Sequence, residues 1–142
     1  MNLLIINGPN INMIGIREPG IYGSESYADL LKLIDETASS AGISYKHFQS
    51  NHEGAIVDEI QAAYGNFDGI IINPAAYTHT SVAIHDAIKA VTAPVVETHI
   101  SNVYKREEFR HKSIISSACV GVIGGFGLDS YRLGVEALLK LN

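Results

Sequence analysis

An arginine and a tyrosine stand five positions apart in the stretch REPGIYGSE, residues 17–25. Tyrosine has a pKa of about 10, so its phenolate is a strong base, and a nearby guanidinium favours the ionised form. Arg17 and Tyr22 can therefore form a base that abstracts a proton. The simpler interpretation, in which the Tyr22 ring only packs over a pocket, is the better one for this stretch taken alone.

A carboxylate and an imidazole meet in the segment ETHISN, residues 97–102. Glu97, His99 and Ser101 alternate with other residues, so they share one face for as long as the strand continues. A carboxylate beside an imidazole fixes its tautomer and raises its pKa, which suits a general acid. A structural ion pair explains the segment equally well, so both interpretations stay open.

Polar residues also gather after three apolar runs, in NGPN, NPAAYTHT and ETHISN. The carboxyl ends of parallel strands face one edge of an open sheet, where ligands bind. Asparagine before glycine or proline is common in turns, and Thr78, Thr80 or Ser81 could cap a helix. One such cluster alone is explained by a structural role in a turn or a helix cap, but three clusters at one edge indicate a binding or catalytic site. The residues expected to converge there are Asn7, Asn10, Asn73, His79, Glu97, His99 and Ser101.

The elements that must position these residues alternate between strand and helix. The predicted strands cover residues 2–6, 43–49, 68–73, 94–98 and 118–125. Three amphipathic helices lie between them, and a fourth is predicted over residues 128–141. Their apolar faces carry Leu30, Leu31, Ile34 and Ala38, then Ile56, Ile60 and Ala63, then Ala83, Ile84, Ala87, Ile88 and Val91.

This alternation predicts an α/β fold of the flavodoxin-like class. Because crossovers are right-handed, we expect a three-layer sandwich with a five-stranded parallel sheet in the order 2-1-3-4-5 and helices on both faces. Residues 1–142 are expected to form a single catalytic domain. Residues 8 to about 24 show no helix or strand pattern, and a connection of this length is typical of a functional lid.

Composition excludes several classes of protein. The net charge is −5 and the Lys and Arg residues are scattered, so nucleic acid is not expected as a partner. The chain opens without the basic region of a signal peptide and has no apolar run of membrane-spanning length, so we expect a cytoplasmic protein without membrane contact. Cys119 is the only cysteine, and its apolar neighbours predict a buried thiol in a strand.

Five segments in order carry a family resemblance: NGPNINMIGIREPGIYGSE, QSNHEG, NPAAYTHTSVAIHDA, PVVETHISNVYKREEFRHKS and GFGLDSYRLG. Together they resemble type II 3-dehydroquinate dehydratase, the small dehydroquinase of the shikimate pathway. The resemblance implies a hydro-lyase that converts 3-dehydroquinate to 3-dehydroshikimate by trans-dehydration through an enolate. It also implies that no metal and no organic cofactor take part.

The resemblance further implies a role for each catalytic residue. Tyr22 is the base, and Arg17 lowers its pKa. Asn10 helps to hold a water at the enolate oxygen. His99, oriented by Glu97, donates the proton to the departing hydroxyl.

Substrate binding and assembly are implied in the same way. Ile100 and Ser101 contact the substrate carboxylate with help from Asn73. The ring hydroxyls are held by Arg110, His79 and an Asp86 that reaches in from a neighbouring subunit. The family assembles trimers into a homododecamer. Two positions depart from its pattern, since His85 replaces the usual arginine and Ala75 the usual glycine.

One alternative function keeps the same residues. Two imidazoles and a carboxylate are plausible metal ligands, so His79, His99 and Glu97 could serve a metal-dependent hydrolase. Activity that survives a chelator would count against it. A lysine Schiff base is not expected, because no lysine lies in an apolar segment suited to a depressed pKa.

Overall fold

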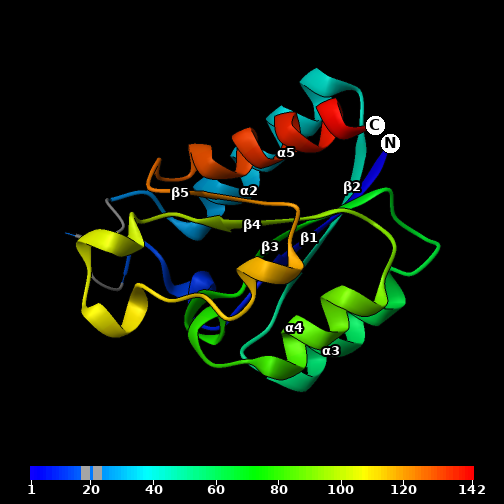
Figure 1. Cartoon of the computed structure of the whole chain (residues 1–142). Helices are drawn as coiled ribbons and strands as arrows, with labels where there is room; N and C mark the ends of the chain where they lie inside the picture. Colours follow the sequence, from blue (N-terminus) through cyan, green and yellow to red (C-terminus); the bar gives the residue numbers. More distant parts are fainter. Residues whose placement is uncertain (17–19, 21–23) are drawn as a thin grey trace.

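A five-stranded parallel sheet forms the middle of the molecule (Figure 1). The computed structural model describes residues 1–16, 20 and 24–142. The strand order is β2-β1-β3-β4-β5, as predicted. The strands are β1 (Asn2–Asn7), β2 (Ser44–Gln49), β3 (Gly69–Asn73), β4 (Val95–His99) and β5 (Gly121–Gly124).

Helices cover both faces of this sheet, so the predicted flavodoxin-like fold is confirmed. One face carries α2 (Tyr27–Ala41) and α5 (Asp129–Leu141), and the other carries α3 (Glu53–Ala62) and α4 (Val82–Ala90) (Figure 1). The alternating side chains of β1 and β3 point to opposite faces and nucleate two apolar clusters. Within the described part of the chain, no helix is long and apolar enough to span a membrane.

The central strands are buried along their length, whereas the edge strands are only half-buried. Every residue of β3 and β4 is buried, which explains why their apolar runs were recognisable in the sequence. The edge strand β5 alternates between half-buried and exposed residues and is shorter than the predicted strand over 118–125. The face predicted for the third helix is also wrong at one position, since Ala83 is exposed.

Cys119 lies outside the sheet, contrary to the strand prediction. Residues Ser116–Ala118 form a short 3₁₀ helix, η5, and Cys119 ends it, two residues before β5. The Cys119 thiol is half-buried, and burial raises its pKa to about 12. The thiol is therefore less buried than predicted, and a turn rather than a strand carries it.

The connection after β1 contains more regular structure than the sequence indicated. A 3₁₀ helix, η1, spans Ile11–Met13, and the side chains of Ile11 and Ile14 are buried in the core. These two anchors hold the beginning of the connection against the sheet. The rest of the predicted lid includes residues 17–19 and 21–23, which lie outside the described residues.

Gly8 brings the ends of β1 and β3 together. Its backbone N–H donates to the Asn73 carbonyl oxygen at 2.8 Å. A Cβ atom at Gly8 would lie 2.5 Å from the Pro74 carbonyl oxygen, closer than any side chain tolerates. Only glycine permits this approach, which explains its place in the motif NGPN.

Ala75 occupies a backbone conformation that favours glycine. It opens the 3₁₀ helix η2 (Ala75–His79) with a φ of +52°. We expect Ala75→Gly to raise the free energy of unfolding by about 0.5–1 kcal/mol, because the left-handed region strains a residue with a Cβ. Chemical denaturation measures this. The neighbouring Ala76→Gly is the matched control and should destabilise slightly, and a gain of stability in both variants would contradict the assignment of strain to Ala75.

Candidate active site

Two adjoining cavities open at the edge formed by the carboxyl ends of β1, β3 and β4. Their volumes are about 350 Å³ and about 70 Å³. The segment 100–116, yellow to orange in Figure 1, closes this edge on the outside. Both cavities are lined by His79, His99, Ser101 and Arg110.

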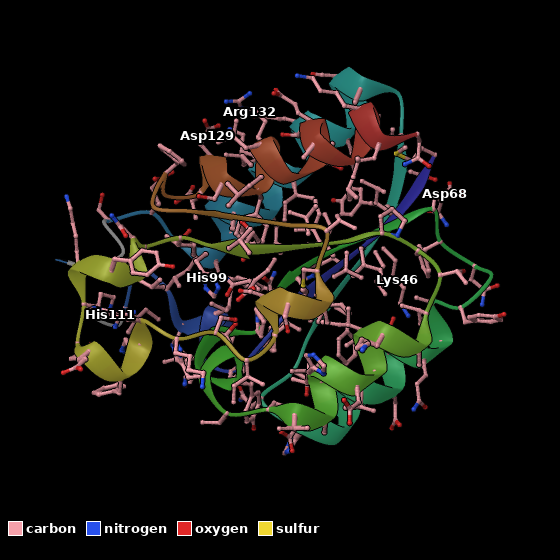
Figure 2. All side chains as sticks on the ribbon, in the orientation of Figure 1. Lys46, Asp68, His99, His111, Asp129 and Arg132 are labelled. Carbon is pink, nitrogen blue, oxygen red and sulfur yellow. The ribbon has the colours of Figure 1, made fainter. Side chains whose placement is uncertain are left out.

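Glu97 and His99 form a buried pair on β4. The Glu97 side chain is wholly buried, and His99 retains 8% of its surface. His99 Nε2 lies 2.7 Å from Glu97 Oε1. An ionised Glu97 can only accept, so Nε2 carries a proton and donates a hydrogen bond to Oε1. The Nδ1 atom of His99 has no hydrogen-bond partner among the residues that the structure describes. His99, labelled in Figure 2, lines both cavities, so Nδ1 is the atom available to a ligand.

Three hydroxyls complete the environment of the Glu97 carboxylate. Thr78 and Ser116 each donate to one of its oxygens, and Ser113 Oγ donates to Oε1 at 2.9 Å. Burial by itself would raise the pKa of Glu97, but the hydrogen bonds from the imidazole and the hydroxyls outweigh it and lower the pKa to about 2. Glu97 is therefore a fixed anion that holds the His99 ring in one orientation.

The depressed pKa of Glu97 predicts a defined loss of stability in acid. A carboxylate with a folded pKa below its unfolded value stabilises the fold above the unfolded value, 4.5 here, and the gain is lost as the pH falls through the folded value. Between about pH 5 and pH 2 we expect Glu97 to account for a loss of about 3 kcal/mol. Unfolding free energies of the wild type and Glu97→Gln across this range measure it. Parallel curves for the two proteins would contradict the prediction.

Thr78, Ser113 and Ser116 were not recognised as site residues in the sequence. Thr78 is one of three candidate helix caps in the sequence, but Ser81 caps α4 by accepting from the backbone N–H of Ile84. Ser113 precedes the short 3₁₀ helix η5 and Ser116 begins it, and neither residue belongs to a periodic pattern in the sequence. These three residues are identified as site residues only by their hydrogen bonds to Glu97 in the structure.

Two hydrogen bonds attach the outer segment to η2. His79 Nδ1 donates to the Lys112 carbonyl oxygen at 2.8 Å, and the Ile114 N–H donates to the Thr78 carbonyl oxygen at 2.8 Å. A neutral His79 therefore carries its proton on Nδ1 and keeps Nε2 as an acceptor. Arg110 comes from the same outer segment, where Glu107 accepts a hydrogen bond from its Nε at 2.8 Å.

The structure brings most of the predicted site residues together. Asn10, Asn73 and Ile100 line the smaller cavity beside His99 and Ser101. Asn10 has a φ of +68° and lies at the start of η1. Asn7, predicted to converge there, is instead fully buried behind the cavities.

Three predicted residues are not placed in this site. Arg17 and Tyr22 lie outside the described residues. Asp86 lies on the surface of α4 with 71% of its side chain exposed, and its carboxylate faces the His85 ring at 3.0 Å. It lines neither cavity of its own chain.

The donor arrangement does not favour the metal-dependent alternative. Within residues 1–16, 20 and 24–142, no group of three or more His, Cys, Asp and Glu side chains is disposed to hold a metal ion. Glu97 directs its oxygens toward hydroxyls and His99, and His79 uses Nδ1 for the Lys112 carbonyl. These groups are held by protein hydrogen bonds rather than gathered around a common point.

A flavodoxin-like sheet with a buried carboxylate–imidazole pair at its carboxyl edge defines an α/β enzyme equipped for proton transfer. The chain matches the family model described as Dehydroquinase class II over residues 1–139, and it belongs to that family. The predicted resemblance is thereby confirmed.

Relatives and solved structures agree with this membership. A 3-dehydroquinate dehydratase of Caldicellulosiruptor bescii is 58% identical, over 98% of this chain and 97% of its own length. One of Clostridium acetobutylicum is 54% identical, over 99% and 98%. The crystal structure of the type II dehydroquinase from Butyrivibrio crossotus has a TM-score of 0.96 at 52% identity, covering 98% of this chain and 97% of its own.

Proposed function

We propose that the chain dehydrates 3-dehydroquinate to 3-dehydroshikimate at the two adjoining cavities, through an enolate. The activity, that of a hydro-lyase in the shikimate pathway, follows from membership of the class II dehydroquinase family. The observation that supports this site for the reaction is the buried Glu97–His99 pair, whose imidazole Nδ1 is left for a ligand.

The reaction needs a base, a stabiliser for the enolate oxygen and an acid. Tyr22, with its pKa lowered by Arg17, removes the proton next to the ketone. A water held by Asn10 donates to the enolate oxygen as negative charge develops there. His99 then gives its Nδ1 proton to the departing hydroxyl, which leaves as water while Glu97 balances the charge of the imidazolium.

Recognition of the substrate uses the remaining residues at this edge. The backbone at Ile100 and the Ser101 hydroxyl bind the carboxylate, with a hydrogen bond from the Asn73 amide. His79 Nε2 accepts from one ring hydroxyl, and Arg110 donates to another. This set binds an anion without a basic surface, which agrees with the net charge of −5.

Turnover tests the proposal directly. The product is an enone, so its absorbance should appear when 3-dehydroquinate is added to the purified protein. The rate should be unchanged by a chelator. Loss of activity on chelation would favour the metal-dependent alternative, and a folded protein that produces no enone would overturn the proposed function.

We further propose that the protein works in the cytoplasm as a homododecamer built from trimers, in which Asp86 completes the site of a neighbouring subunit. Two observations support this role: the Asp86 carboxylate is exposed, and Asp86 lines neither cavity of its own chain. The proposed reaction uses no metal and no organic cofactor, and the proposed assembly binds neither a membrane nor nucleic acid.

Asp86→Ala should raise KM more than it lowers kcat, by about tenfold in KM, because a contact made equally in the ground and transition states serves binding alone. Steady-state kinetics and sedimentation should be measured on the same samples. Lys89→Ala, on the exposed side of the same helix, is the matched control. A monomer with full activity would contradict the shared site.

A further inference from the structure

A chain of buried hydrogen bonds runs behind the smaller cavity, and Tyr131 of α5 stands in its middle. We propose that Tyr131 is a positioning residue, whose hydroxyl sets the orientation of the Asn73 carboxamide and thereby the affinity for the substrate carboxylate. The inference rests on the proposed function, in which Asn73 helps to bind that carboxylate.

The hydroxyl of Tyr131 joins the ends of two central strands. Asn73 Nδ2, at the end of β3, donates to Tyr131 Oη at 2.8 Å. Tyr131 in turn donates to Asn7 Oδ1, at the end of β1, at 2.5 Å. Tyr131 and Asn7 are fully buried, and Asn73 keeps 2% of its surface.

The direction of this chain is fixed at the Asn73 end. The backbone N–H of Ala75 can only donate, and it lies 3.1 Å from Asn73 Oδ1. Asn73 must therefore direct its oxygen toward Ala75 and its Nδ2 toward Tyr131. The single hydroxyl proton of Tyr131 is then committed to Asn7, whose Nδ2 lies 3.1 Å from His47 Nε2.

This arrangement leaves one N–H of Asn73 for the cavity. An amide nitrogen carries two donors, and Tyr131 accepts one of them. The other belongs to a side chain that lines the smaller cavity beside Ile100 and Ser101. Without the Tyr131 hydroxyl, the first N–H would be buried without an acceptor, and the carboxamide would gain by turning away from its bound orientation.

The test is Tyr131→Phe, which removes the hydroxyl and keeps the ring. We expect KM for 3-dehydroquinate to rise about tenfold, with kcat within about twofold of the wild type, because Asn73 serves binding in ground and transition states alike. Tyr27→Phe is the matched control. The Tyr27 hydroxyl lies 2.8 Å from His47 Nε2, at the far end of the same series of hydrogen bonds. Loss of this hydroxyl should leave KM unchanged.

A double-mutant cycle separates positioning from general destabilisation. Asn73→Ala should raise KM, and adding Tyr131→Phe should then raise it no further, since the hydroxyl acts only through the amide. Additive effects of the two changes would overturn the inference. So would a folded Tyr131→Phe protein with wild-type KM, provided that Asn73→Ala raises KM.

The same cycle keeps the inference distinct from the function on which it rests. An unchanged KM in Asn73→Ala would overturn the proposed contact between Asn73 and the carboxylate, and the inference with it. If Tyr131→Phe fails to fold by near-ultraviolet circular dichroism, Asn7→Leu leaves the tyrosine in place but removes the acceptor that orients its hydroxyl. That variant should also raise KM and retain kcat, and a wild-type KM in folded Asn7→Leu would overturn the inference.

Discussion

His99→Gln should lower kcat by roughly 10³-fold, within the range that general acid catalysis contributes. Glutamine is of similar size, and its amide can still donate to Glu97, so the packing around the pair is preserved. It cannot deliver a proton to the departing hydroxyl, because an amide does not titrate in this range. The rate of enone formation at saturating substrate measures the loss.

A second histidine provides the control for this substitution. His111 lines the larger cavity but is exposed, and its Nε2 faces the Arg106 carbonyl oxygen rather than a carboxylate. His111→Gln should therefore keep kcat within a few-fold. Near-normal turnover in a folded His99→Gln protein would remove His99 from its role as the acid.

Tyr22→Phe should nearly abolish turnover, with a fall in kcat of roughly 10³-fold or more, because removal of the hydroxyl removes the base itself. Substrate binding should persist, since the aromatic ring and the remaining contacts are unchanged. Calorimetric titration with 3-dehydroquinate would measure the affinity, and enone absorbance the rate.

Tyr64→Phe supplies the matched control, because Tyr64 is exposed on the connection after α3 and lies in neither cavity. It should behave as the wild type. If Tyr22→Phe folds, binds substrate and turns over at a comparable rate, another group must abstract the proton. The role of Arg17 as the group that lowers the pKa of Tyr22 would fail with it.

The fold could be predicted because its central strands carry a strong local pattern. The run of three isoleucines in β3 is buried on both faces, and such a run is hard to place anywhere except in the middle of a sheet. The strand order followed from the handedness of crossovers. The edge strand β5 was less well bounded, because its residues are half-buried or exposed and its apolar pattern continues into Ala118 and Cys119.

The site could be predicted only where the topology dictates it. Residues at the carboxyl ends of β3 and β4 must meet at one edge, and Asn73 and His99, the last residues of these strands, do. Ser113 and Ser116 reach Glu97 from 16 and 19 residues away through an irregular segment, and no periodic pattern encodes that path. Tyr131 falls within the helix predicted over residues 128–141, but the partners of its hydroxyl could not be predicted.

The bond between Tyr131 and Asn7 spans 124 positions of the chain, which has a consequence for the order of folding. A contact this distant in sequence carries a large loop-closure cost, so it forms after the local helices and the neighbouring strand pairs. During synthesis the first strand leaves the ribosome long before the last helix exists. Asn7 Oδ1 and Asn73 Nδ2 therefore lack their Tyr131 partner until α5 docks. We expect full affinity for the substrate to be acquired at this last stage of folding.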